Sequence, residues 1–208
     1  MHNYSLDSDI KTKIVWILTI ISVILIFIIG IVTNMFGITF IPLQINLENI
    51  IKIAIKLGSF SLIFVLIYLL FDKFLWKNTF IKKFHGIPDF NGKWEGNFIS
   101  NRVDENGNNY TGSCNLIVKQ TWGKISIVSN FEKSTSYSKS AYININGVDG
   151  ITLSFDYNNK AEKTNDSNLK QHNGHNDFTY IESENKLRGN YFNDKNRETN
   201  GIIEVIKL

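Results

Sequence analysis

The 208-residue sequence has a single cysteine, two prolines and little net charge. One thiol, Cys114, cannot form a disulfide within the chain, which fits a reducing compartment. Cys114 lies in a strand-like run, so we expect its side chain to pack in the hydrophobic core. A formal net charge of +3 is too small to favour a DNA or RNA polymer as partner, because such partners require a strongly basic face.

The sequence also lacks the common catalytic motifs, since it contains no GxSxG, no Walker loop and no HExxH. His172 and His175 could form half of a metal site. Their segment is rich in asparagine and offers no cysteine or second histidine pair, so we predict no metal. The run "DENGNN" at 104–109 lacks the glycine and the acidic residue that a calcium loop needs at its sixth and twelfth positions, so it predicts a turn. We therefore expect a protein that is not an enzyme.

Two hydrophobic segments predict a membrane hairpin near the N-terminus. Residues 14–32 contain no charge and would span roughly 28 Å as a helix, close to the hydrocarbon thickness of a bilayer. A signal peptide is the alternative, but the run is long for one and no small-x-small cleavage site follows. The second run, 57–71, becomes a full span only if Lys52 and Lys56 extend to the interface; a buried core helix is the alternative. We predict spans at about 14–33 and 53–71.

The lysine distribution predicts the orientation of this hairpin. Six lysines flank its outer ends, whereas the link between the two runs holds Lys52 and Lys56. Basic residues favour the cytoplasmic side, so we expect a multi-pass membrane protein with both termini in the cytoplasm. The expected organisation is an N-terminal segment (1–13), the hairpin (14–71), a basic connector (72–87) and a cytoplasmic β-rich domain (88–208). Small or polar residues predicted to pack the membrane helices are Ser22, Gly30, Gly58 and Ser61.

From residue 92 onward, polar and apolar residues alternate with period two, and Gly, Asn and Asp clusters interrupt the alternation. This pattern predicts antiparallel strands joined mostly by short links, and closing such a meander removes its exposed edges. We therefore expect an all-β, roughly eight-stranded, up-and-down barrel. The predicted strands are 92–100, 112–120, 123–131, 137–146, 150–157, 176–183, 186–193 and 199–207.

The alternation also predicts which side chains face the interior. Tyr157, Tyr180 and Tyr191 share the inward parity, and each needs a partner for its hydroxyl. A barrel of eight strands is either filled by side chains or holds one small ligand at its mouth. The polar run 158–176 shows no apolar periodicity and predicts a mobile loop or lid at one end.

Tyrosine faces can stack on nucleobases, and arginines can form charge-assisted hydrogen bonds to phosphates. The alternative is that the tyrosines are core aromatics and the arginines are solvated surface charges. The candidate ligand-binding residues are Arg102, Tyr110, Tyr137, Tyr142, Tyr157, Arg188 and Tyr191.

The run "PDFNGKWEGNF" (88–98) follows the hydrophobic third and opens the β-domain. We expect Gly92 and Gly96 to let the first strand bend and Trp94 to fill the nearby end of the barrel. The chain thus combines two apolar runs, a lysine-rich connector, and Pro88 followed by a glycine-x-tryptophan-x-glycine pattern. In this combination it resembles the two-transmembrane, β-strand-rich effectors of bacterial CBASS anti-phage systems. The resemblance covers nearly the whole chain.

The resemblance implies a function. In such systems a CD-NTase makes a cyclic dinucleotide, the barrel binds it, and the effector oligomerises and disrupts the inner membrane, so that the infected cell dies by abortive infection. Two alternatives stay open. The barrel could be a structural or adaptor module that binds a protein partner, or it could carry an apolar ligand.

Overall fold

The computed structural model describes residues 1–35, 47–161, 171–195 and 197–208, without the side chains of 33–57, 59 and 161. The chain divides into two compact units. One contains residues 1–8 together with 82–208, and the other contains residues 9–81.

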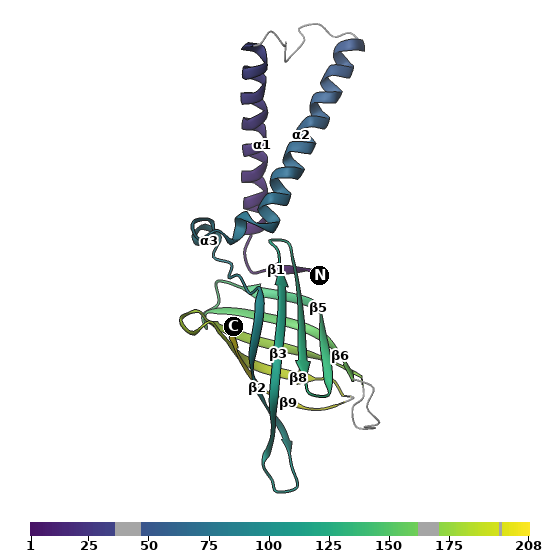
Figure 1. Ribbon diagram of the computed structural model, residues 1–208, viewed down its shortest axis with the longest axis vertical. Helices are drawn as coiled ribbons and strands as arrows, with labels where there is room; N and C mark the ends of the chain where they lie inside the picture. The colour runs from purple at the N-terminus through teal and green to yellow at the C-terminus, as the bar shows by residue number, and fades with distance from the viewer. Residues whose placement is uncertain (36–46, 162–170, 196) are drawn as a thin grey trace. The chain divides into compact units, whose positions relative to one another are not determined.

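The first unit is a sheet that closes on itself (Figure 1). Its nine strands are paired in the cyclic order β1-β4-β3-β2-β9-β8-β7-β6-β5, and β4 also pairs with β5. The eight strands from β2 to β9 form an antiparallel meander whose last strand pairs with its first. The strands are β1 (His2–Leu6), β2 (Gly92–Val103), β3 (Asn109–Gln120), β4 (Lys124–Phe131), β5 (Ser134–Asn144), β6 (Ile151–Ala161), β7 (His172–Ile181), β8 (Lys186–Asn193) and β9 (Asn200–Lys207).

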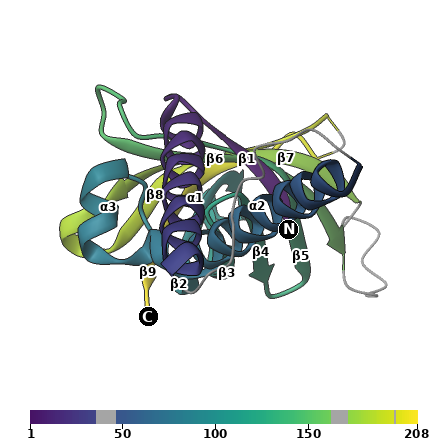
Figure 2. The ribbon, with the colours of Figure 1, turned by 90° about the horizontal axis from the view of Figure 1, so that it is seen from above.

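Alternate side chains along most of these strands enter the interior, as the period-two pattern predicted. On β5 the alternation shifts by one residue between Ser138 and Ser140. Leu116 and Val118 of β3, Ile125 and Ile127 of β4, and Leu187 of β8 are all buried. Figure 2 shows β2 and β3 on one side of the ring and β6 and β7 on the other. The ring therefore encloses its own hydrophobic core.

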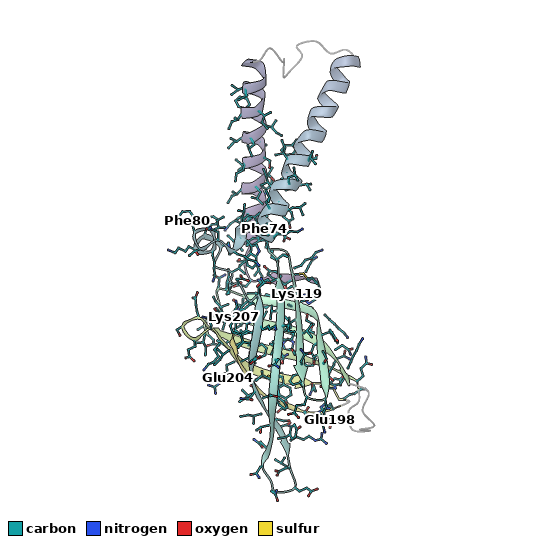
Figure 3. The ribbon with its side chains drawn as sticks, in the orientation of Figure 1. Phe74, Phe80, Lys119, Glu198, Glu204 and Lys207 are labelled. Carbon is teal, nitrogen blue, oxygen red and sulfur yellow. The ribbon has the colours of Figure 1, made fainter. Side chains whose placement is uncertain are left out.

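The closed end of the core is built by the run 88–98, where β2 begins. Trp94 is fully buried and donates its indole N–H to the carbonyl of Phe90, at 3.0 Å. Gln120 accepts the Phe90 amide at 2.8 Å and donates to the Pro88 carbonyl at 3.3 Å. Gly92 has a φ of 130°, in the region that favours glycine. Figure 3 labels Lys119 and Lys207 near this end of the ring.

The ninth strand was not expected, because a five-residue run before a hydrophobic segment carries little strand signal. β4 and β5 pair directly only from Val128 and Tyr137 to their turn, and beyond that point they separate. β1 fills the gap, antiparallel to β4 and parallel to β5. Tyr4 is buried there and donates to the carbonyl of Trp122 at 2.7 Å. Residues 2–6 thus complete the ring and are not merely a tail before the first hydrophobic segment.

The polar run 158–176 also differs from the prediction. β6 continues to Ala161 and β7 begins at His172, so both ends of the run are strand; residues 162–170 lie outside the described part of the chain. Asn159, His172 and Asn176 are inward-facing and buried. The alternation of hydrophobic residues fails here because polar side chains occupy inward positions.

The second unit contains two long helices, α1 (Ile10–Met35) and α2 (Leu47–Lys73). Within it, Ile14, Leu18 and Ser22 of α1 and Phe71 of α2 are buried, whereas most of α1 exposes isoleucine, leucine and valine. Among the described residues, the stretch Ile10–Val32 is the one helix long and apolar enough to cross a membrane. The basic connector contains a 3₁₀ turn (Leu75–Lys77) and a short helix, α3 (Thr79–His85).

We expect Gly96→Ala to lower the free energy of unfolding by about 1–3 kcal/mol. A methyl group at this position would collide with the backbone carbonyl of Glu204 on the paired strand β9. Backbone atoms cannot give way as the end of a side chain can. Thermal or denaturant unfolding of the purified chain measures the effect, with Asn97→Ala, an exposed neighbour, as the control. Equal stability of the two variants would contradict this account of the glycine.

A second prediction concerns pH. The carboxylate of Asp7, which follows β1, accepts hydrogen bonds from the backbone amides of Ile145 and Asn146, both at 2.9 Å. Burial raises the pKa of Asp7, but these hydrogen bonds outweigh it and hold the pKa below its ordinary value of 3.8. The stabilisation that the Asp7 carboxylate gives the folded state is therefore present above its ordinary pKa of 3.8, and it is lost as the pH falls through the lowered pKa of the folded state.

The stability difference between the wild type and Asp7→Asn should accordingly shrink as the pH is lowered from 7 to 3. Unfolding curves across this range provide the measurement. Asp149→Asn, at an exposed carboxylate in the turn after β5, is the matched control. A difference that stays constant over the whole range would show that the Asp7 carboxylate does not anchor β1.

Candidate ligand-binding cavity

A cavity of about 390 Å³ lies at the end of the ring remote from Trp94. This volume falls within the roughly 300–1,000 Å³ typical of small-molecule sites. Figure 1 shows the β2–β3 hairpin extending beyond the neighbouring strands at this end, and Figure 3 labels Glu198 on the β8–β9 loop nearby. The lining residues come from β2 to β9 and their loops, and β1 contributes none of them. They are Phe98, Ser100, Arg102, Val103, Tyr110, Gly112, Phe131, Glu132, Lys133, Ser134, Ser136, Tyr157, Asn159, His172, Tyr191, Asn193, Arg197, Thr199 and Ile203.

Aromatic rings form much of the wall. Phe98 packs edge-on against Phe131, with ring centroids 5.5 Å apart, and lies 5.9 Å from the ring of Tyr110. Tyr157 and Tyr191 line the cavity from β6 and β8. Flat aromatic faces of this kind suit the stacking of a planar heterocycle.

The two inner tyrosines have hydroxyl groups that are already engaged. Tyr157 donates to Asn193 Oδ1 at 2.7 Å, and Asn193 in turn donates to Thr199 Oγ1 at 2.6 Å. Burial raises the pKa of both Tyr157 and Tyr191, while a hydrogen bond with Ser100 lowers that of Tyr191 in part. Both phenols are therefore neutral at physiological pH, and their ring faces rather than their charges are available to a ligand.

A polar patch forms part of the inner wall. Ser136 of β5, Asn159 of β6 and His172 of β7 are consecutive neighbours across the sheet. All three are buried, and Ser134 extends the patch along β5. Asn159 donates its amide hydrogens to Ser134 and Ser136, at 3.1 and 2.8 Å.

Three cations surround the mouth of the cavity. Arg102 comes from β2, Lys133 from the β4–β5 turn and Arg197 from the β8–β9 loop, and Glu132 is the one carboxylate among the lining residues. None of the three cations forms an ion pair with another residue in the described part of the chain. The mouth therefore favours an anionic ligand.

The β8–β9 loop is held in place by Asp194. Its carbonyl accepts the amides of Arg197 and Glu198, at 3.0 and 2.9 Å. Its carboxylate accepts the amide of Asn173 on β7, at 3.0 Å. Glu198 has a φ of 50°, which completes the tight reversal of the loop. This geometry places Arg197 and Thr199 at the cavity.

The structure brings four of the seven candidate ligand-binding residues together: Arg102, Tyr110, Tyr157 and Tyr191 line the cavity. Tyr137 and Tyr142 are exposed and do not line it. Arg188 is likewise exposed and lies 3.6 Å from the Glu204 carboxylate. These three belong to outward-facing positions on their strands. Binding roles for all seven remain predictions, and the cavity favours the first four.

Sequence reasoning missed Lys133, Asn159 and His172 as site residues. Lys133 lies in a two-residue turn, and the other two lie in the run predicted to be a loop. A usable signal was present, because Asn159 and Tyr157 are two residues apart and so share one face of a strand. His172 and His175 face opposite sides of β7: His172 lines the cavity, whereas the His175 ring nitrogen contacts the Asp156 carboxylate at 2.8 Å.

Cys114 takes no part in this site. It is buried between strands, and burial raises the pKa of its thiol to about 12. The thiol is therefore protonated and unreactive at physiological pH. Among the residues that the structure describes, no group of three or more His, Cys, Asp or Glu side chains could hold a metal ion.

A closed ring of strands with an aromatic, cationic cavity at one end defines a receptor domain for a small anionic ligand. Residues 85–207 match the family described as Cap15, cyclic dinucleotide receptor domain. CD-NTase-associated protein 15 of Yersinia aleksiciae is 30% identical over 146 residues, which cover 70% of this chain and 68% of that relative. The chain belongs to the Cap15 cyclic dinucleotide receptor domain family, and the resemblance to CBASS effectors is thereby confirmed.

Proposed function

We propose that the cavity at the open end of the ring is the cyclic-dinucleotide site of this CBASS effector. The observation that carries the proposal is that one cavity, in a receptor domain of this family, combines aromatic surfaces for stacking with three cations that form no ion pair in the described part of the chain. A cyclic dinucleotide has two planar bases and two phosphates. Tyr157, Tyr191 and Phe131 offer faces for the bases, and Arg102, Lys133 and Arg197 offer charge for the phosphates.

The second part of the proposal concerns the output. Helices α1 and α2 would form a two-span hairpin in the inner membrane of a bacterial cell, with both termini and the ring in the cytoplasm. The apolar, exposed surface of α1 supports a membrane location. Ligand binding would favour an oligomeric state of the hairpins that disrupts the membrane, and the infected cell would die. A ligand can drive this change only through its higher affinity for the oligomeric state.

β1 supports a coupling between sensor and output. It is hydrogen-bonded within the ring, and three residues separate its last residue, Leu6, from the first residue of α1, Ile10. The chain therefore links a strand of the sensor directly to the first membrane helix. Any ligand-dependent change in the β4–β5 seam would reach α1 through this short segment.

The adaptor and the carrier of an apolar ligand remain the alternatives. The polar and cationic lining of the cavity disfavours an apolar ligand. An adaptor requires no small-molecule cavity at all, so the binding experiment distinguishes it from a receptor.

The direct test is calorimetry on the full chain in detergent micelles, because a fragment that begins near residue 84 would lack β1. The ligands are cyclic di- and trinucleotides, with linear dinucleotides as controls. Micromolar or tighter binding of one cyclic dinucleotide is expected. Absence of heat from every cyclic species, on protein shown to be folded, would favour the adaptor.

Arg197→Ala should weaken binding of the preferred cyclic dinucleotide about tenfold or more, because it removes a cation at the mouth of the cavity. Salt dependence of the affinity should also decrease. Arg188→Ala is the matched control, since Arg188 lies outside the cavity, and its affinity should equal that of the wild type. Tyr137→Ala and Tyr142→Ala test the two remaining outward residues. Loss of binding in Arg188→Ala but not in Arg197→Ala would place the ligand elsewhere on the ring.

Gly30→Leu should abolish ligand-triggered permeabilisation while leaving ligand affinity unchanged. Gly30 is buried in α1, and Ser22 on the same helix is buried with its hydroxyl donating to the Leu18 carbonyl at 2.7 Å. Small residues let membrane helices approach closely. By contrast, Gly58 and Ser61 of α2 are exposed within the unit. Dye release from vesicles containing the protein provides the measurement, with Ile28→Leu as the control. Unchanged dye release from Gly30→Leu would remove Gly30 from the proposed packing.

A further inference from the structure

Asn159 occupies a distinctive place in the cavity. It lies on β6, directly between Ser136 of β5 and His172 of β7, and only 4% of its surface is exposed. Both hydrogens of its amide are used, because Nδ2 donates to Ser134 Oγ at 3.1 Å and to Ser136 Oγ at 2.8 Å. These two hydrogen bonds fix the orientation of the side chain.

The Oδ1 atom of Asn159 is buried and has no hydrogen-bond partner among the described residues. An amide oxygen has two lone pairs, and burying it unpaired costs folding free energy. Buried polar atoms in folded proteins are rarely left in this state. Because Asn159 lines the cavity, a bound ligand could supply the missing donor.

The surroundings indicate which part of the ligand approaches this atom. The cations Arg102, Lys133 and Arg197 lie at the mouth, where they would meet phosphates. Asn159 instead belongs to the inner wall, two residues from Tyr157 on the same face of β6. The Tyr157 hydroxyl is already bonded to Asn193. Asn159 therefore offers a free hydrogen-bonding atom beside an aromatic face.

We propose that Asn159 is a specificity-determining residue of the cavity: its Oδ1 accepts a hydrogen bond from an N–H group of one nucleobase of the bound cyclic dinucleotide. The inference rests on the proposed function and extends it from the ligand class to the atom that reads a base. Asparagine amides that read base edges in DNA use a donor and an acceptor together. Here both amide hydrogens are engaged by serines, so the acceptor Oδ1 alone would read the base. A site built around a buried polar atom discriminates against ligands that leave this atom unpaired.

The ligand provides the first test. Wild-type protein is titrated with its preferred cyclic dinucleotide and with analogues in which one base nitrogen at a time has every hydrogen replaced by methyl, so that an amino group becomes dimethylamino. At least one methylated analogue should bind about tenfold more weakly or worse, because it cannot donate to Oδ1. Equal affinity for the parent and for every analogue would overturn the inference. This test uses wild-type protein alone, so it does not depend on whether a variant folds.

The protein provides the second test. Asn159→Ala should lose about tenfold in affinity for the parent ligand and should no longer distinguish it from the sensitive analogue. Asn159→Asp keeps an acceptor but adds a negative charge beside an anionic ligand, so it should also bind weakly. Asn176→Ala is the matched control: Asn176 is 3% exposed and its Oδ1 is also unpaired, yet it does not line the cavity.

The outcomes distinguish failure of the proposed function from failure of the proposed role of Asn159. If wild-type protein binds no cyclic dinucleotide, the proposed function fails, and the base-reading role fails with it. If the wild type binds but Asn159→Ala retains the same affinity and the same sensitivity to methylation, the function stands and the role of Asn159 is wrong. Equal losses in Asn159→Ala and Asn176→Ala would likewise overturn it, because a general effect of removing a buried amide would then explain both.

Discussion

Closure of the β-sheet is the constraint on which the rest of the structure depends. An open sheet leaves a row of unpaired amides and carbonyls at each edge, and a closed one leaves none. Here β9 returns to pair with β2, so the meander closes in sequence order. The remaining weak point is the seam between β4 and β5, which pair over four positions before they separate. β1 fills this seam, and the N-terminal residues thereby become part of the domain that begins again at residue 82.

Closure also explains how one small domain combines a dry core with a polar cavity. Near the start of β2, bulky side chains such as Trp94 and Phe90 occupy the interior and exclude ligand. Toward the other end the inward positions carry Ser136, Asn159 and His172, which cannot pack as a dry core. Polar atoms placed there must be bonded to one another, to water or to a ligand. The cavity therefore forms where the inward positions of the strands change from large apolar residues to polar ones.

The electrostatics of the two halves of the cavity differ in a way that suits one ligand class. The mouth carries cations on three separate segments, which come together only because β2, the β4–β5 turn and the β8–β9 loop meet at the same end of the ring. The inner wall carries neutral tyrosines and amides. A ligand with anionic groups and planar polar groups would match this division. The family to which the chain belongs binds ligands of this description.

The sequence by itself determined the strand pattern and much of the core, because the period-two alternation of apolar residues reports the buried face directly. It also placed Tyr157 and Tyr191 in the interior, since parity along a strand is a local property. Tertiary structure alone decided three things. It assigned residues 2–6 to the sheet, because their partners are more than a hundred residues away. It gathered Arg102, Lys133 and Arg197 at one mouth, and left Tyr137, Tyr142 and Arg188 outside it. It placed the polar residues around Asn159 and His172 in strands, because the pairing of β6 with β5 and β7 maintains the extended backbone although the side chains carry no hydrophobic signal.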